Sequence, residues 1–315
     1  MAYSWPHTTL AGRLPVVTVD NHLAHSDDNG TTWVFDRTLW TSQAENDPTT
    51  GEAGYSNNET VSLAPRQTPS GVAWYYVRMR YFTRVGGFKF NTFHLRVGQA
   101  ASPLQLADAR EGVLGGALTP KEWNVDTDLS KLAPDVAACT WSDPGLLFQN
   151  DNLYLAVQCY VVNQSGEHPD REFVALFATK PDGPAPAWKW RYVGKLTMRE
   201  DAVALGGESF TQTDLAYSRD GALMVIVSPS MPGMSLEAHT GCLAIEVTSL
   251  EPPVLARDAS GRPKVRASVT ASDLGTEGPG ACGYDPASVT GIVIMRRVVG
   301  QGQLVGTLTA TGLRP

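Results

Sequence analysis

Carboxylates recur at one place in a repeated pattern of short segments, and paired carboxylates can carry out acid–base chemistry. Each segment has a polar or acidic start, an apolar run, a Gly/Asn/Asp turn and a second apolar run, as in residues 59–79, 142–162 and 213–230. The candidate carboxylates are Asp20, Glu59, Asp143, Glu208, Asp214 and Asp285. A protonated carboxyl can protonate a leaving oxygen while an ionised carboxylate activates water or attacks carbon, which suits cleavage of a glycosidic bond.

The segments that would position these carboxylates have the pattern of β-strands. Short alternating or apolar runs, such as 72–84, 153–162 and 291–299, end at turn signals including DNG, NDN, RDG and GQG. Short helices are expected only near 102–112 and 127–137. The sequence therefore predicts an all-β chain.

The repeat predicts a β-propeller. Counting the N-terminal segment gives five units, and at about 40–60 residues per four-stranded blade the 315 residues fit five blades, or six, in one domain spanning 1–315. A two-sheet sandwich is the alternative. In a propeller the first strand of every blade lies at the centre, so carboxylates at the starts of these strands converge on one face.

One turn matches a known folding motif at every fixed position. The residues Ser26-Asp27-Asp28-Asn29-Gly30-Thr31-Thr32-Trp33 fit S-x-D-x-G-x-T-W, which resembles the Asp box of sialidases and other propeller glycosidases. We expect Asp28 to accept hydrogen bonds from backbone N–H groups, Gly30 to adopt a positive φ and Trp33 to pack between sheets. The motif predicts architecture and carries no chemistry of its own.

Two longer stretches resemble the five-bladed glycoside hydrolases of the arabinanase, β-xylosidase and fructosidase group. They are TWSDPGLLFQNDNLYLAVQC (140–159) and LGGESFTQTDLAYSRDGALMVIVSPS (205–230). The resemblance implies that Glu208 is the general acid and that Asp143 orients it and tunes its pKa. It also implies hydrolysis with inversion, for which acid and base carboxyls stand roughly 6.5–9.5 Å apart.

The general base is left open between three residues. The family's base Asp heads the first strand of the first blade, whereas Asp20 lies only six residues before Ser26, where a hairpin turn at Asp20-Asn21 is expected. Glu59 and Asp285 are the alternatives. His239, in Glu237-Ala238-His239, also resembles a family position. A structural Ca²⁺ or Na⁺ at the centre of the propeller is implied by the resemblance alone; no other cofactor is predicted.

Other classes of propeller protein compete with this interpretation. Arg13-Leu14-Pro15 resembles the R-I-P motif of sialidases, and Arg78, Arg171 and Arg296 are candidates for an arginine triad that binds a substrate carboxylate. A lyase would use His94 or Tyr284 beside Arg296. A lectin-like, non-catalytic module would use aromatic platforms such as Trp141. The substrate-binding candidates are Arg78, Arg171, Trp141, His239 and Tyr284.

Composition excludes several partners. The net charge is −7 without a basic run, which disfavours nucleic acid, and no stretch of about 18 apolar residues predicts a membrane span. The expected partner is a carbohydrate. The N-terminal segment does not have the pattern of a signal peptide, so the compartment is open between the cytoplasm and, if a leader has been removed, the periplasm or the outside of the cell.

The cysteines and histidines predict no metal site. No C-x-x-C pair or H-E-x-x-H occurs, and neither His94 nor His168 has the spacing of a paired ligand. A turn centred on residues 149–152 would place residue 162, rather than Cys159, opposite Cys139. Buried free thiols are therefore favoured over a disulfide.

Overall fold

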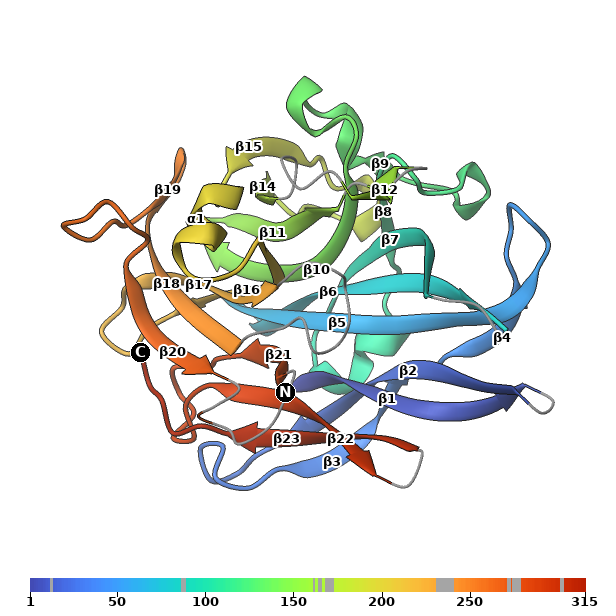
Figure 1. Cartoon of the computed structure of the whole chain (residues 1–315), viewed down its shortest axis with the longest axis horizontal. Coiled ribbons are helices and arrows are strands. Elements are labelled where there is room, and N and C mark those ends of the chain that lie inside the picture. Colours follow the sequence, from blue (N-terminus) through green and yellow to red (C-terminus); the bar gives the residue numbers. More distant parts are fainter. Residues whose placement is uncertain are drawn as a thin grey trace.

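A computed structural model shows sheets arranged as the blades of a β-propeller (Figure 1). The structure describes residues 1–11, 14–85, 89–160, 162–163, 166–167, 173–230, 241–270, 273, 279–300 and 303–315. Within these residues the chain forms five blades. The predicted all-β propeller is confirmed, and the two-sheet sandwich is wrong.

The blades follow one another along the chain. Blade 1 holds β1 (Ala2–Ala11), β2 (Leu14–His25) and β3 (Val34–Trp40). Blade 2 holds β4 (Gln43–Asn46), β5 (Ala53–Thr68), β6 (Gly71–Arg84), β7 (Lys89–Ala100), β8 (Gly112–Gly115) and β9 (Thr127–Asp128). Blade 3 holds β10 (Thr140–Gln149), β11 (Asn152–Tyr160), β14 (Phe173–Thr179) and β15 (Arg191–Lys195). Blade 4 holds β16 (Ser209–Tyr217), β17 (Leu223–Ser230), β18 (Gly241–Leu250), β19 (Pro253–Leu255) and β20 (Val265–Thr270).

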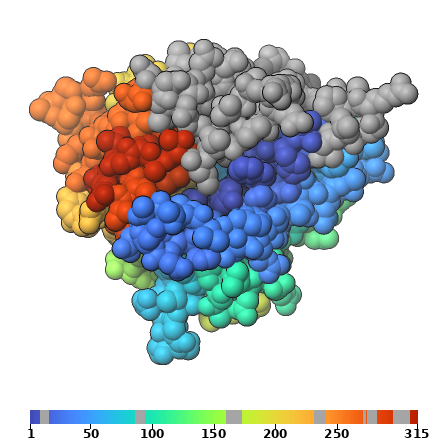
Figure 2. Space-filling model, turned by 90° about the horizontal axis from the view of Figure 1, so that it is seen from below, coloured from blue at the N-terminus to red at the C-terminus, as the bar shows by residue number. Residues whose placement is uncertain are grey.

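Blade 5 holds β21 (Pro279–Gly283), β22 (Val293–Gly300) and β23 (Gln303–Ala310), and a separate small pair is formed by β12 (Val162–Asn163) and β13 (Gly166–Glu167). The ring closes because β10 contacts both β5 and β16, β16 contacts β21, β5 contacts β1, and β1 contacts β23. Figure 2 shows the blue strands of blade 1 beside the red C-terminal region. We call β1, β5, β10, β16 and β21 the inner strands.

Helices are short in the described part of the chain. The two expected helical stretches contain 3-10 turns at Pro103–Asp108, Leu129–Lys131 and Pro134–Val136. The α-helix α1 (Arg199–Ala204) was not predicted, because six residues are too few to show a helical period.

Three inner strands carry a bulge, which lies near the start of β10 and β16 and in the middle of the longer β5. The register shifts between Glu59 and Ser62 in β5, between Ser142 and Gly145 in β10, and between Thr211 and Asp214 in β16. The second residue of each bulge has a positive φ: 48° at Thr60, 50° at Asp143 and 55° at Gln212. A bulge leaves an extra residue unpaired and re-aims its side chain. We call this end of the inner strands the bulge end.

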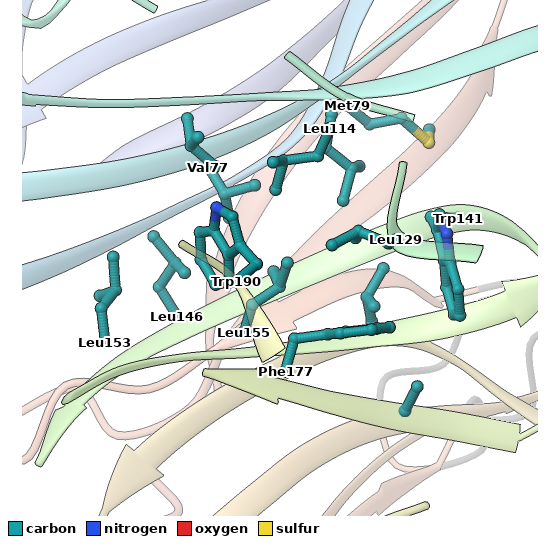
Figure 3. Packing of buried hydrophobic residues seen from close by; sticks show 14 of the residues in the cluster. Val77, Met79, Leu114, Leu129, Trp141, Leu146, Leu153, Leu155, Phe177 and Trp190 are labelled. Atoms are coloured by element: carbon teal, nitrogen blue, oxygen red, sulfur yellow. The ribbon is translucent and has the colours of Figure 1, made fainter. Parts of the chain in front are cut away.

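Apolar side chains from blades 2 and 3 meet in one core cluster. Figure 3 shows Val77 of β6 and Leu114 of β8 facing Leu155 of β11 and Phe177 of β14. These side chains are at most 1% exposed. Removing this much apolar surface from water stabilises the contact between neighbouring blades.

Both cysteine pairs are disulfides, so the expectation of free thiols is wrong. Cys139 bonds to Cys159, with 5.1 Å between their Cα atoms, and Cys242 bonds to Cys282. The bulge in β10 changes the hairpin register by one residue and pairs Trp141 with Cys159. Cys139 then lies diagonally opposite Cys159, within reach of a disulfide.

Among the described residues, the structure contains no helix with the length and apolar character needed to span a bilayer.

Candidate functional site

Asp143 joins three blades at the bulge end. Its Oδ1 accepts a hydrogen bond from Oγ1 of Thr60 in β5 at 3.0 Å, and its Oδ2 accepts one from Oγ1 of Thr211 in β16 at 2.5 Å. The hydroxyl of Thr213 donates to the backbone carbonyl of Asp143. These contacts hold both carboxylate oxygens in one orientation, between the neighbouring inner strands.

Glu59 lies beside Asp143. The hydroxyl of Tyr81 is hydrogen-bonded to Glu59. Burial raises the pKa of Tyr81 well above its ordinary value, and the charges of Glu59 and Asp143 raise it further. The two carboxylates therefore act on the same buried hydroxyl, which places Glu59 and Asp143 in one electrostatic environment.

Asp214 is a partly buried carboxyl on the inner strand β16. Its Oδ1 accepts hydrogen bonds from Oγ of Ser62 and from the N–H of Leu215, both at 3.0 Å. A Cβ placed on Gly283 of β21 would stand 3.6 Å from its Oδ2. Burial raises the pKa of Asp214 to about 7, although both hydrogen bonds oppose the shift. Near neutral pH this carboxyl is therefore partly protonated.

Glu208 stands one residue before β16 and is partly open to solvent. Its N–H donates to the carbonyl of Ser230 at 2.7 Å, and its side chain is 37% exposed. An η nitrogen of Arg199 lies 4.0 Å from its Oε2. Thr211, which contacts Asp143, lies three residues after Glu208. Glu208 therefore lies roughly 10 Å from Thr211 along the chain, on the side where β16 begins.

Asp20 and Asp285 accept hydrogen bonds from groups other than those that hold Asp143. Asp20 lies inside β2, paired with Trp5, and the hairpin turn expected at Asp20-Asn21 is wrong. Its Oδ1 accepts hydrogen bonds from the backbone N–H and hydroxyl of Ser42. Asp285 is exposed after β21 and accepts from the N–H of Ala287 at 2.8 Å. Both carboxylates therefore stabilise nearby backbone through these hydrogen bonds.

Two proposed substrate contacts are buried structural residues. Trp141 is 1% exposed and packs edge-on against Phe177, so it offers no platform for a sugar ring. Arg78 donates to both carboxylate oxygens of Glu111, at 2.9 and 2.8 Å, and to Asn58. Its guanidinium is thus already committed, and Arg78 is unsuited to binding a substrate carboxylate.

The other candidate arginines and the candidate histidines His168 and His239 fall in parts of the chain whose side chains the structure does not describe. Arg13, Arg171, His168 and His239 lie outside the described residues, as does the cation expected near His239. The strand of Arg296 is described, but its side chain is not. Among the described residues, no group of three His, Cys, Asp or Glu side chains could hold a metal ion.

The residues suggested for a lyase are also buried. His94 is 1% exposed, and its Nε2 accepts a hydrogen bond from Nε of Arg96 at 2.9 Å. Burial, followed by the charge of Arg96, lowers the pKa of His94 well below its ordinary value. Tyr284 is 8% exposed, and burial raises its pKa. Neither residue is suited to exchanging protons with a substrate.

The turn at residues 26–33 has the expected local hydrogen bonds. Asp28 accepts from the N–H of Thr32 at 2.8 Å and from its hydroxyl at 2.7 Å, and Gly30 has a φ of 86°. These bonds to Thr32, together with one from Ser26, lower the pKa of Asp28 to about 2. Trp33 is 37% exposed and its Nε1 donates to the carbonyl of Gly30, so its expected packing between sheets is wrong.

The sequence did not single out the hydroxyl residues that hold the carboxylates. A signal was present: the bulges are the tetrapeptides ETVS (59–62), SDPG (142–145) and TQTD (211–214). Aligning them places Asp143 at the position of Thr60 and Gln212, and Asp214 at that of Ser62. Glu59 and Asp143 are therefore neighbours from different bulge positions, not equivalents in the repeat.

Neither a protein-family model nor a curated protein sequence matches this chain. The structure is similar to an endo-1,4-β-xylanase from Bacteroides thetaiotaomicron, at 12% sequence identity and a TM-score of 0.36, over 85% of this chain and 92% of the xylanase. It is similar to a Dyadobacter fermentans protein of unknown function, at 8% identity and a TM-score of 0.43, over 96% of this chain and 71% of that chain.

It is also similar to an α-L-arabinanase from Cellvibrio cellulosa solved with arabinohexaose, at 9% identity and a TM-score of 0.38, over 87% of this chain and 73% of the arabinanase. Xylanase and arabinanase structures are thus among those that the chain resembles. At identities and TM-scores this low, the likeness assigns no activity to the chain.

Proposed function

We propose that this protein hydrolyses a glycosidic bond by carboxylate acid–base chemistry at the bulge end of its inner strands. The observation that carries the proposal is the hydrogen bonding of Asp143 to Thr60 and Thr211, which ties the bulges of β5, β10 and β16 together. Glu59 directly precedes Thr60, and Glu208 precedes Thr211 by three residues. Three carboxylates from three adjacent blades thereby share one end of the propeller.

Each carboxylate has a role that its surroundings support. Glu208 is partly exposed, so it can reach a leaving-group oxygen and protonate it as general acid. Asp143, held on both oxygens, orients the site and adds the negative charge that tunes the acid. Glu59 activates water as general base, since Asp20 and Asp285 are engaged elsewhere. With separate acid and base carboxylates the product would have inverted configuration.

A hydrolysis screen tests this proposal. Aryl arabinofuranosides, xylosides, fructosides and sialosides, together with polysaccharides, are offered to the wild type and to Glu208→Gln, Asp143→Asn and Glu59→Gln. On a neutral sugar we expect kcat to fall by about 10²–10⁴-fold in Glu208→Gln and Glu59→Gln. The matched controls are Glu200→Gln and Asp182→Asn, two exposed carboxylates that should retain wild-type turnover.

Two outcomes would overturn the proposal. Turnover of a sialoside alone, surviving all three substitutions, would move the chemistry to the arginines. No turnover of any substrate, combined with glycan binding, would make the protein a lectin-like module instead.

A further inference from the structure

A cavity lies between blades 3 and 4, where β10 and β16, the strands that carry Asp143 and Asp214, end. It has a volume of about 740 Å³. Its walls are the β10–β11 turn at residues 149–152, the β16–β17 turn at 221–223, and residues 246–251 of β18 and its end. Gln149 is six residues beyond Asp143 along β10, so the cavity lies roughly 20 Å from the candidate catalytic group.

The charged groups of this cavity are already neutralised. Glu246 lies 2.9 Å from the Nζ of Lys264 and 3.0 Å from Nη1 of Arg266. Glu251 is paired with Arg191 and accepts a hydrogen bond from the hydroxyl of Tyr154 at 2.6 Å. With its carboxylates paired to cations from the same blades, the cavity offers no net charge to an ionic ligand, which favours a neutral one.

Apart from glycine and apolar residues, the rest of the wall carries amides, hydroxyls and tyrosine side chains. Nε2 of Gln149 donates to the hydroxyl of Tyr217 at 2.7 Å, which links blade 3 to blade 4 across the cavity. Nδ2 of Asn152 donates to the carbonyl of Asn150 at 3.2 Å. Thr248 is exposed on the opposite wall. Carboxamides and hydroxyls both donate and accept, so they can match the alternating donors and acceptors of a polyhydroxylated ring.

We infer that this cavity is a non-catalytic binding site for a neutral oligosaccharide. Its volume falls within the range of about 300–1,000 Å³ that is typical of small-ligand sites. The partly exposed Tyr217 supplies an apolar face with a polar tip, which suits the mixed surface of a sugar. The site does not depend on hydrolysis at the bulge end, and it would hold a chain of sugar residues on the opposite side of the propeller.

Binding measurements on the intact protein test this inference. Xylohexaose, arabinohexaose and cellohexaose are titrated by calorimetry into the wild type, Gln149→Ala and Thr248→Trp. Gln149→Ala removes the amide that bridges the blades, and Thr248→Trp fills the cavity from its exposed wall. The matched controls are Gln99→Ala and Thr49→Trp, which alter exposed residues of the same types in blade 2 and its β4–β5 turn.

We expect at least one neutral hexasaccharide to bind the wild type and both controls, and both cavity variants to weaken this binding at least tenfold. Glu208→Gln should bind as the wild type does at this site, which separates the cavity from the proposed catalytic group. A uronic-acid oligosaccharide should bind more weakly than the neutral probes. Thermal unfolding of each variant shows whether it folds. If Thr248→Trp does not fold, the binding measured with Gln149→Ala tests the inference by itself.

The inference is overturned if Gln149→Ala binds every neutral probe as tightly as the wild type. It is also overturned if no neutral probe binds, or if the uronic-acid oligosaccharide binds best. Loss of hydrolysis in Glu208→Gln with binding unchanged would support both sites. Binding that disappears in Glu208→Gln but persists in Gln149→Ala would leave the catalytic proposal standing and remove this one.

Discussion

Ser62 of blade 2 donates its hydroxyl hydrogen to Oδ1 of Asp214 of blade 4 across a distance of 3.0 Å. The same Oγ accepts a hydrogen bond from the N–H of Leu146 in blade 3, also at 3.0 Å. One hydroxyl therefore connects three consecutive blades near the centre of the propeller. The carboxyl that it contacts is partly buried, and its raised pKa makes Asp214 sensitive to pH.

Asp214 should make the protein less stable as the pH rises. Burial raises the pKa of Asp214 from its ordinary value of 3.8 to about 7. Between about pH 4 and pH 7 the unfolded chain loses this proton while the folded protein retains it. The free energy of unfolding should therefore fall by up to about 1.4 kcal/mol per pH unit from this group.

The substitution Asp214→Asn tests this by removing the titration while keeping an acceptor for Ser62. Denaturant unfolding should show the stability of Asp214→Asn relative to the wild type increasing between about pH 4 and pH 8. The exposed substitution Asp182→Asn serves as control and should show no such trend. A difference between wild type and Asp214→Asn that stays constant over this range would contradict the expected pH dependence.

Thr211 should stabilise the contact between blades 3 and 4 through Asp143. In Thr211→Val the shape of the side chain is kept, but Oδ2 of Asp143 loses its hydroxyl donor. We expect the free energy of unfolding to fall by about 1–3 kcal/mol, the cost of an unpaired buried polar group. Thr211→Ser keeps the hydroxyl and should recover most of this loss. Equal stability of the Val and Ser variants in urea unfolding would show that the hydrogen bond contributes nothing measurable.

The pair formed by Arg78 and Glu111 should act in stability rather than in substrate binding. The side chain of Arg78 is 6% exposed and that of Glu111 is 19% exposed. Glu111→Gln would leave a buried guanidinium without its counter-charge, and we expect a loss of about 3 kcal/mol. Glu52→Gln breaks the exposed pair with Arg84 and should change stability by less than about 1 kcal/mol.

Substrate affinity separates the two roles of Arg78. If Arg78 binds a substrate carboxylate, Glu111→Gln should change the KM for a sialoside more than the unfolding midpoint. We expect the opposite: the midpoint of urea unfolding should shift, and the KM of the folded protein should stay the same.

The disulfide between Cys242 and Cys282 should stabilise the attachment of blade 5 to blade 4. It joins β18 of blade 4 to β21 of blade 5 and closes a segment with a sequence separation of 40 residues. Replacing both cysteines by Ala should lower the free energy of unfolding by about 2–4 kcal/mol. The corresponding change at Cys139 and Cys159, with a separation of 20, should cost less because the closed loop is shorter. A larger loss for the shorter loop would rule out loop closure as the dominant effect.

The fold could be predicted from local patterns. Alternating apolar residues, Gly and Asn turns and a recurring order of polar start, apolar run, turn and second apolar run predict the strands and the propeller. Each blade is a local meander whose hairpins depend on nearby residues. The turn at Ser26–Trp33 was predicted in its hydrogen bonds for the same reason: Asp28 and Thr32 are four residues apart. The roles predicted for Asp143 and Glu59 stay predictions, and the structure adds that both carboxylates raise the pKa of Tyr81.

Relations between blades could only come from the tertiary structure. The bulges shift each inner strand by one residue, and this shift made Cys159 reach Cys139 and placed Asp143 opposite Thr60 and Thr211. Burial also depends on distant segments: Trp141 is covered by Phe177, and Asp214 is enclosed by residues from blades 2 and 5.

The sequence alone therefore determined the all-β class, most of the strands and turns, and the propeller with five or six blades, because contacts between neighbouring residues govern them. The tertiary structure decided which carboxylates are buried, which are paired and which remain open. Those properties depend on solvent exclusion and on hydrogen bonds between residues such as Ser62 and Asp214, which are 152 positions apart.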